Sequence, residues 1–156
     1  MYDLNRTKLA QWRPNYFTSP YMDLSQKGII LIDPQTFNGL IQITELGLDH
    51  NKLTQITPGT LDPLVNLIKL DLSDNQLTHL DDRLFINQKH LTHLNVSWNK
   101  LTQIREGTFD SLVNLKGIDL EFNELISLDK ELFKKCKKLK ETKISGNPCE
   151  SSCSIS

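Results

Sequence analysis

Cysteine, aromatic residues and long apolar runs are all scarce in this chain of 156 residues. The three cysteines, Cys136, Cys149 and Cys153, are an odd number, so closed disulfides within the chain leave at least one thiol unpaired. No stretch reaches the roughly 18 consecutive apolar residues that a membrane-spanning helix needs. We therefore expect no insertion into a membrane and no dense disulfide framework.

Acidic and basic residues are nearly equal in number, so the net charge is −1 and the pI is about 6.4. This balance gives no overall attraction to nucleic acid, and we expect none as a partner. The N-terminus, Met1-Tyr2-Asp3-Leu4, lacks the basic and apolar segments of a secretory signal. Two locations stay open: cytoplasmic if this is the full product, or extracellular, as a cell-surface ectodomain, if it is a fragment of a longer chain.

A period of 24 residues runs through most of the sequence. Apolar residues recur at this spacing in several columns, and asparagine recurs in another. The columns include Ile43, Leu67, Leu91, Leu115 and Leu139; Leu46, Leu70, Leu94 and Ile118; Leu61, Phe85, Phe109 and Phe133; and Asn51, Asn75, Asn99, Asn123 and Asn147. Such a fixed period is the signature of a solenoid built from stacked repeats.

Each column has a physical reason. Apolar residues two positions apart, such as Leu46 and Leu48, share one face of a short strand. One strand per repeat, stacked in parallel, makes a sheet whose inner face packs on the core. Stacked asparagines can satisfy the buried backbone groups of the turns that follow the strands. The phenylalanine column fills the wider convex side. We predict an α/β solenoid with a parallel sheet on one side and turns and short helices on the other.

We predict three parts in the chain. Residues 1–18 form an N-terminal cap, in which Leu9, Trp12, Tyr16 and Phe17 cover the first coil, or alternatively a disordered leader. Residues 19–138 form five repeats, with boundaries 19–42, 43–66, 67–90, 91–114 and 115–138, and the first of them carries Lys27 in the asparagine column. Residues 139–156 form a last strand and a partial C-terminal cap.

The pattern LxxLxLxxNxLxxI/LxxxxF/LxxL, as in residues 43–64, resembles the "typical" extracellular class of the leucine-rich-repeat family. The ending Ser145-Gly146-Asn147-Pro148-Cys149, followed by Cys153, is similar to the start of that family's cysteine-containing cap, here truncated. The resemblance implies a horseshoe whose curved parallel sheet binds protein partners on its concave face. Cys149 and Cys153 either bond each other or have lost partners, and Cys136, in a leucine column, is expected to be a buried thiol.

Outward positions of the strands give the candidate binding surface, in which acidic residues outnumber basic ones. A concave surface of one sign attracts a partner with a basic patch, although aspartates at strand ends can instead cap turns. Trp98 and Phe122 lie at equivalent positions one repeat apart, and they form either a binding hot spot or a local packing pair. The predicted partner-binding residues are Asp49, His50, Asp71, Asp74, His93, Asn95, Trp98, Asp119, Glu121 and Phe122.

Catalysis is not expected. His50, Asp74 and Ser73 could approach one another, but they occupy variable positions on an open surface without an oxyanion loop. Asp49, Asp71 and Asp74 could hold a calcium ion only at a weak surface site, because a dedicated loop is absent. No motif indicates a cofactor, so we predict no catalytic, cofactor-binding or metal-binding residues.

Two functions stay open on the sequence alone. The first is a protein-binding receptor or immune-recognition ectodomain, and the second is an intracellular scaffold or regulatory subunit that docks within a larger assembly through an exposed flank. Lys134, Lys135, Cys136, Lys137 and Lys138 form a basic run that we interpret as a solvated convex edge. Asn5 and Asn95 begin matches to the glycosylation sequon, a short and weakly specific pattern. Neither the ligand nor the oligomeric state follows from the sequence.

Overall fold

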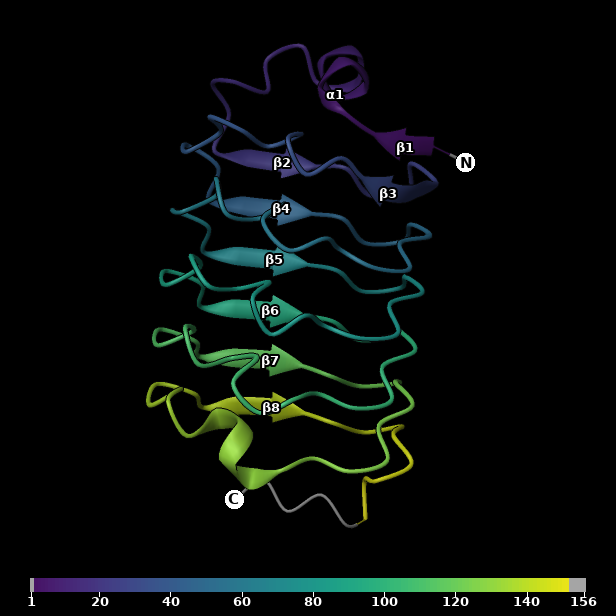
Figure 1. Ribbon diagram of the computed structural model, residues 1–156, viewed down its shortest axis with the longest axis vertical. Coiled ribbons are helices and arrows are strands. Elements are labelled where there is room, and N and C mark those ends of the chain that lie inside the picture. Colours follow the sequence, from purple (N-terminus) through teal and green to yellow (C-terminus); the bar gives the residue numbers. More distant parts are fainter. Residues whose placement is uncertain (1, 152–156) are drawn as a thin grey trace.

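Six short parallel strands, stacked in chain order, form the main sheet of the computed structural model, in which residues 2–151 are described (Figure 1). The strands are β2 (Tyr21–Asp23), β4 (Glu45–Gly47), β5 (Lys69–Asp71), β6 (His93–Asn95), β7 (Gly117–Asp119) and β8 (Glu141–Lys143). Paired residues such as Leu46 and Leu70 are 24 positions apart in the sequence. One sequence period is therefore one complete coil, and the predicted parallel-sheet solenoid is confirmed.

The core lies inside the coils, beneath the sheet. The central residue of each inner strand points into it, and Leu46, Leu70, Leu94 and Ile118 are each 2% exposed. On the far side of the core, the centroids of the buried Phe85 and Phe109 rings lie 6.0 Å apart. The Phe109 ring also stacks on the Phe133 ring, with a centroid distance of 5.6 Å. These columns pack coil on coil, so each repeat buries its apolar side chains against its neighbours.

The asparagine column joins the turns that follow the strands. The Asn75 Oδ1 atom accepts the Leu53 N–H at 3.0 Å, and its Nδ2 atom donates to the carbonyls of Leu48 and Leu72 at 3.0 and 3.1 Å. One amide thus satisfies groups of its own coil and of the preceding coil. The same arrangement recurs at Asn51, Asn99, Asn123 and Asn147.

The convex side consists mostly of turns, with one short 3-10 helix, η1 (Lys130–Phe133), in the part of the chain that the structure describes. Glycines at positive φ, such as Gly59 at 92° and Gly107 at 89°, permit tight turns there. Because these turns need few residues, a coil closes in 24 positions without a full helix.

Residues 2–18 fold over the first coil. Strand β1 (Tyr2–Leu4) pairs in parallel with β3 (Ile29–Ile32), and helix α1 (Arg6–Trp12) follows. Leu4 and Leu9 are fully buried, and Tyr16 is 8% exposed. Trp12 packs against the core, whereas Phe17, which we expected to cover the first coil, is 53% exposed. Its ring instead lies beside Tyr16 at the surface, with centroids 4.1 Å apart.

The cysteines differ in state. Cys136 is a free, buried thiol whose Sγ atom contacts the Phe109 carbonyl at 3.5 Å, and burial raises its pKa to about 11. Cys149 is buried and disulfide-bonded. Cys153 is the partner of Cys149 in one of the two predicted alternatives, and it lies outside the described residues.

Replacing Asn75 by alanine should lower the free energy of unfolding by about 2 kcal/mol, because the buried Leu53 N–H loses its partner. The Leu48 and Leu72 carbonyls still accept from the neighbouring asparagines, which limits the loss. Urea denaturation monitored by circular dichroism measures the change. Asn66→Ala is the matched control, since the Asn66 amide makes one exposed hydrogen bond and its loss should cost under about 1 kcal/mol. Equal losses at the two positions would contradict the role assigned to the column.

The Cys136 thiol should react slowly with iodoacetamide at pH 8 in the folded protein, because a pKa near 11 leaves little thiolate and burial blocks access. Mass spectrometry of alkylated protein measures the rate. In urea the same thiol should react at the rate of an ordinary cysteine, and equal rates in both conditions would show that the site is open.

Candidate functional site

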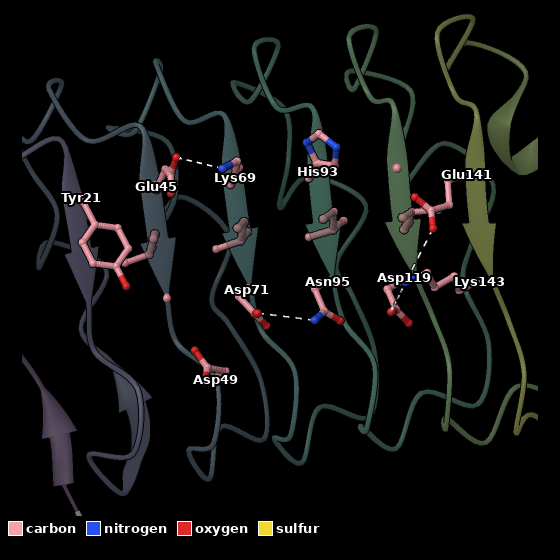
Figure 2. Close-up of a pocket in the computed structure, with 16 residues that line it drawn as sticks. Tyr21, Glu45, Asp49, Lys69, Asp71, His93, Asn95, Asp119, Glu141 and Lys143 are labelled. Carbon is pink, nitrogen blue, oxygen red and sulfur yellow. Dashed lines mark hydrogen bonds and ion pairs between the residues drawn. The ribbon is translucent and has the colours of Figure 1, made fainter.

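The outward face of the main sheet carries two rows of side chains, because the first and third residues of each strand point away from the core. These rows border a shallow hollow of about 380 Å³ that spans all six strands (Figure 2). Figure 2 shows carboxylates, lysines and one histidine side by side across neighbouring strands. Gly47 and Gly117 interrupt the rows, so adjacent side chains such as His93 lean over the backbone there.

Four side chains in the third-residue row hold the turns after their strands. The Oδ1 atoms of Asp23, Asp71, Asn95 and Asp119 each accept the backbone N–H two residues later, at 2.9 to 3.0 Å. Turn capping, one of the two roles predicted for these aspartates, therefore occurs at Asp23, Asp71 and Asp119. It fixes each carboxylate while leaving the second oxygen for other contacts. The hydrogen bonds from Ser25 lower the pKa of Asp23, so this carboxylate stays charged.

Basic side chains neutralise part of the acidic face. Lys69 pairs with Glu45 at 3.1 Å, and Lys143 lies 3.6 Å from Glu141 and 3.8 Å from Asp119. All of these side chains are partly exposed, so each pair contributes little stability. The pairs instead offset the charge of Glu45, Glu141 and Asp119, so the remaining negative charge lies on the other carboxylates of the face.

Arg13, at the end of helix α1, donates to the Asp23 carbonyl and lies 3.5 Å from its carboxylate. Asp71 forms no ion pair in the part of the chain that the structure describes, and neither does Glu121. Asp71, on β5, and Glu121, after β7, therefore keep negative charge that no described cation offsets. Burial raises the pKa of Tyr21, and the charges of Asp23 and Asp49 raise it further.

His50 bridges two carboxylates at the edge of the sheet. Its Nδ1 atom lies 3.0 Å from Asp49 Oδ2, and its Nε2 atom lies 3.4 Å from Asp74 Oδ2. The hydrogen bond to Asp49 is the main cause that raises the pKa of His50; desolvation lowers it by less, and the charges of Asp74, Asp49 and Asp71 raise it further. Protonation of His50 therefore places a cation inside the acidic cluster.

The residue before each position of the asparagine column has a left-handed backbone, both before Lys27 and before the asparagines, where Gly146 has a φ of 76°. The φ angles are 56° at Gln26, 54° at His50, 50° at Asp74, 54° at Trp98 and 52° at Phe122. This conformation is unfavourable for side chains other than glycine, by roughly 1 to 2 kcal/mol per residue. It persists because the N–H of each of these five residues bonds to the next coil, as at Trp98, whose N–H donates to Glu121 O at 2.9 Å.

Trp98 and Phe122 form a stacked aromatic pair. Their ring centroids lie 4.2 Å apart at an interplanar angle of 21°, and the residues are 58% and 43% exposed. Phe122 also covers Gly146, since a Cβ atom there would lie 2.5 Å from its Cδ1 atom. Local packing and exposure thus coexist, and the stack presents an apolar surface next to Glu121 in the chain.

The structure places the predicted binding residues in two adjoining groups. Asp71, His93, Asn95 and Asp119 lie on the strands, and Asp49 and Glu121 follow the strand ends. The remaining four lie in the left-handed column along the edge: His50, Asp74, Trp98 and Phe122. Sequence reasoning missed Arg13, since it lies in the cap, outside every repeat column. Among residues 2–151 no group of three or more His, Cys, Asp or Glu side chains could hold a metal ion.

The imidazole of His50 should titrate above its ordinary pKa of 6.5, and Asp49→Asn should bring that pKa down towards 6.5. A raised pKa in the folded state means that protonated His50 stabilises the fold below pH 6.5 and that this contribution disappears as the pH rises through the folded pKa. NMR titration of the ring protons measures both values. Asp82→Asn, at an exposed carboxylate elsewhere, should leave the titration unchanged, and an unshifted wild-type His50 would contradict the bridge.

No helix among the described residues is long and apolar enough to span a membrane. Comparison with curated protein sequences gave no match. Among solved structures, a chain of the Drosophila Toll–Spatzle complex (glycosylated form) is 32% identical over 81% of this chain and 17% of its own length, with a TM-score of 0.78. The leucine-rich repeat domain of APL1B is 24% identical over 94% of this chain and 42% of its own, with a TM-score of 0.79.

The chain therefore spans well under two thirds of either related structure. The family model for the leucine rich repeat matches residues 21–77 and 65–125, which together cover more than half of the sequence. Members of this family are typically modules for protein interaction rather than enzymes. The stacked parallel strands and these matches show that the chain belongs to the leucine-rich-repeat family.

Proposed function

We propose that this chain is the ligand-binding part of a receptor-like or immune-recognition ectodomain, extracellular or at the cell surface, and that its outward sheet holds a protein with a basic patch. One observation carries the proposal: Asp71, which its turn holds in place, and Glu121 form no ion pair among the described residues, and the same outward side carries an exposed, stacked aromatic pair. The likeness to a chain of the Toll–Spatzle complex, described as a hub in development and innate immunity, supports the same role.

The two groups of residues have separate tasks in this proposal. Asp71 and Glu121 attract a basic partner from a distance, which speeds association and falls with salt. Trp98 and Phe122 supply apolar contact area at low cost in entropy, because their stack is already formed. Protonation of His50 weakens the attraction, so binding is tighter above its pKa than below it.

The second candidate is an intracellular scaffold or regulatory subunit that docks within a larger assembly. Exposed aliphatic residues beside the sheet, including Ile41 at 58% and Val65 at 40%, favour a docking flank of this kind. The first candidate needs a contact on the sheet, whereas the second needs a contact on the flank alone, so mapping the contact separates them.

A photo-crosslinking residue placed at Asn95, on the outward sheet, should capture the ligand from tissue extract of the source organism, with mass spectrometry identifying the product. The same residue at Gln103, which is exposed and outside the sheet, is the control and should not capture it. Capture at Gln103 alone would contradict the proposal.

With the captured protein purified, Trp98→Ala should weaken binding by at least about 30-fold, which corresponds to about 2 kcal/mol for a central aromatic anchor. Asp71→Lys should slow association and reduce its dependence on salt. Biolayer interferometry at two salt concentrations measures both effects. Asp82→Lys makes the same charge change at an exposed position outside the sheet and should change neither, whereas full affinity in Trp98→Ala would remove the aromatic pair from the site.

A further inference from the structure

A second surface lies where the chain enters the strands of the main sheet. It consists of three columns, which begin at Ile41, Gln42 and Thr44 and repeat every 24 residues through five copies. None of these fifteen positions is Asp or Glu, whereas five are lysine. We name this surface the basic flank. It surrounds a hollow of about 540 Å³, separate from the hollow on the sheet.

The basic flank is held in place by the same stacking that builds the sheet. The Asn66 Nδ2 atom donates to the Ile41 carbonyl at 2.9 Å, and Asn114 Nδ2 donates to the Lys89 carbonyl at 2.7 Å. Backbone hydrogen bonds link the column of Thr44 from coil to coil. The flank is therefore preformed, and a partner would not have to order it.

The lysines of the basic flank carry uncompensated charge. Lys116, Lys137 and Lys140 are exposed and form no ion pair with any described carboxylate. By contrast Lys134 and Lys135, close in sequence but outside the flank, pair with Glu106 and Asp110. On sequence alone, the basic run of residues 134–138 is interpreted as one solvated edge. The structure divides it into a paired part and an unpaired part.

Aliphatic side chains share this surface with the lysines. Ile41, Val65 and Ile68 are 58%, 40% and 39% exposed, and Val113 is 45% exposed. The aliphatic residues dominate the coils nearer the N-terminus, and the lysines dominate those nearer the C-terminus. A surface that is apolar at one end and cationic at the other matches a ligand with both features rather than a uniform polyanion.

We propose that the basic flank is a second docking surface, which takes a protein segment carrying aliphatic side chains followed by carboxylates. This segment differs from the basic ligand of the sheet, since the two surfaces have opposite charge. The lysines attract and orient the carboxylates, and the aliphatic residues bury the apolar side chains. One chain can then contact two partners, or two parts of one partner, at the same time.

The probe for this proposal is a short synthetic peptide with leucines in its first half and glutamates in its second. Titrated into the full ¹⁵N-labelled chain, it should shift the amide signals of the basic flank and leave those of the sheet unchanged. In Lys116→Glu/Lys140→Glu the apparent Kd should rise at least about tenfold, because charge attraction becomes repulsion. Ile41→Ser should raise it several-fold, and Asp71→Lys, on the sheet, should not raise it.

Thermal melts monitored by circular dichroism check that each variant folds. Shifts confined to the sheet, or no shifts at all, would overturn the proposal. It would also fail if heparin or a peptide with serine in place of leucine bound as tightly as the probe, because charge alone would then explain binding. Since Asp71→Lys reports separately on the sheet, the two proposed surfaces can fail independently.

Discussion

A constant coil length of 24 residues is the constraint on which this structure depends. The asparagine ladder enforces it, because each side-chain amide must reach the N–H of one coil and the carbonyls of two. An insertion or deletion within a coil would move the asparagine away from these groups and leave buried backbone atoms without partners. Constant length therefore turns sequence columns into straight rows of side chains.

Rows of this kind give the protein two different surfaces at little structural cost. Positions that face the core must stay apolar, whereas outward positions are free to vary without disturbing it. On the sheet these positions carry carboxylates and an aromatic stack, and on the basic flank they carry lysines and aliphatic residues. The left-handed turn residues add an edge where His50 and Trp98 point outward, at a cost in backbone energy that their own hydrogen bonds to the next coil offset.

The sequence was enough to predict the solenoid, the buried columns and the outward rows, because each depends on a period that stacking imposes. Other features depend on contacts outside the period. Arg13 reaches Asp23 from the cap, and Phe17 stays exposed beside Tyr16, so neither could be placed from the repeat. The pairing of Lys143 and the division of the basic run also needed coordinates, since side chains of similar composition differ in the carboxylates within reach.

Native-state hydrogen exchange tests the central claim, that asparagine side chains join the coils, most directly. The amides of Leu53, Leu77, Leu101 and Leu125 lie outside the strands and donate to asparagine oxygens. If the ladder holds, they exchange as slowly as amides within the sheet and open with it as one unit. Fast exchange at these positions, typical of open turns, would contradict the account.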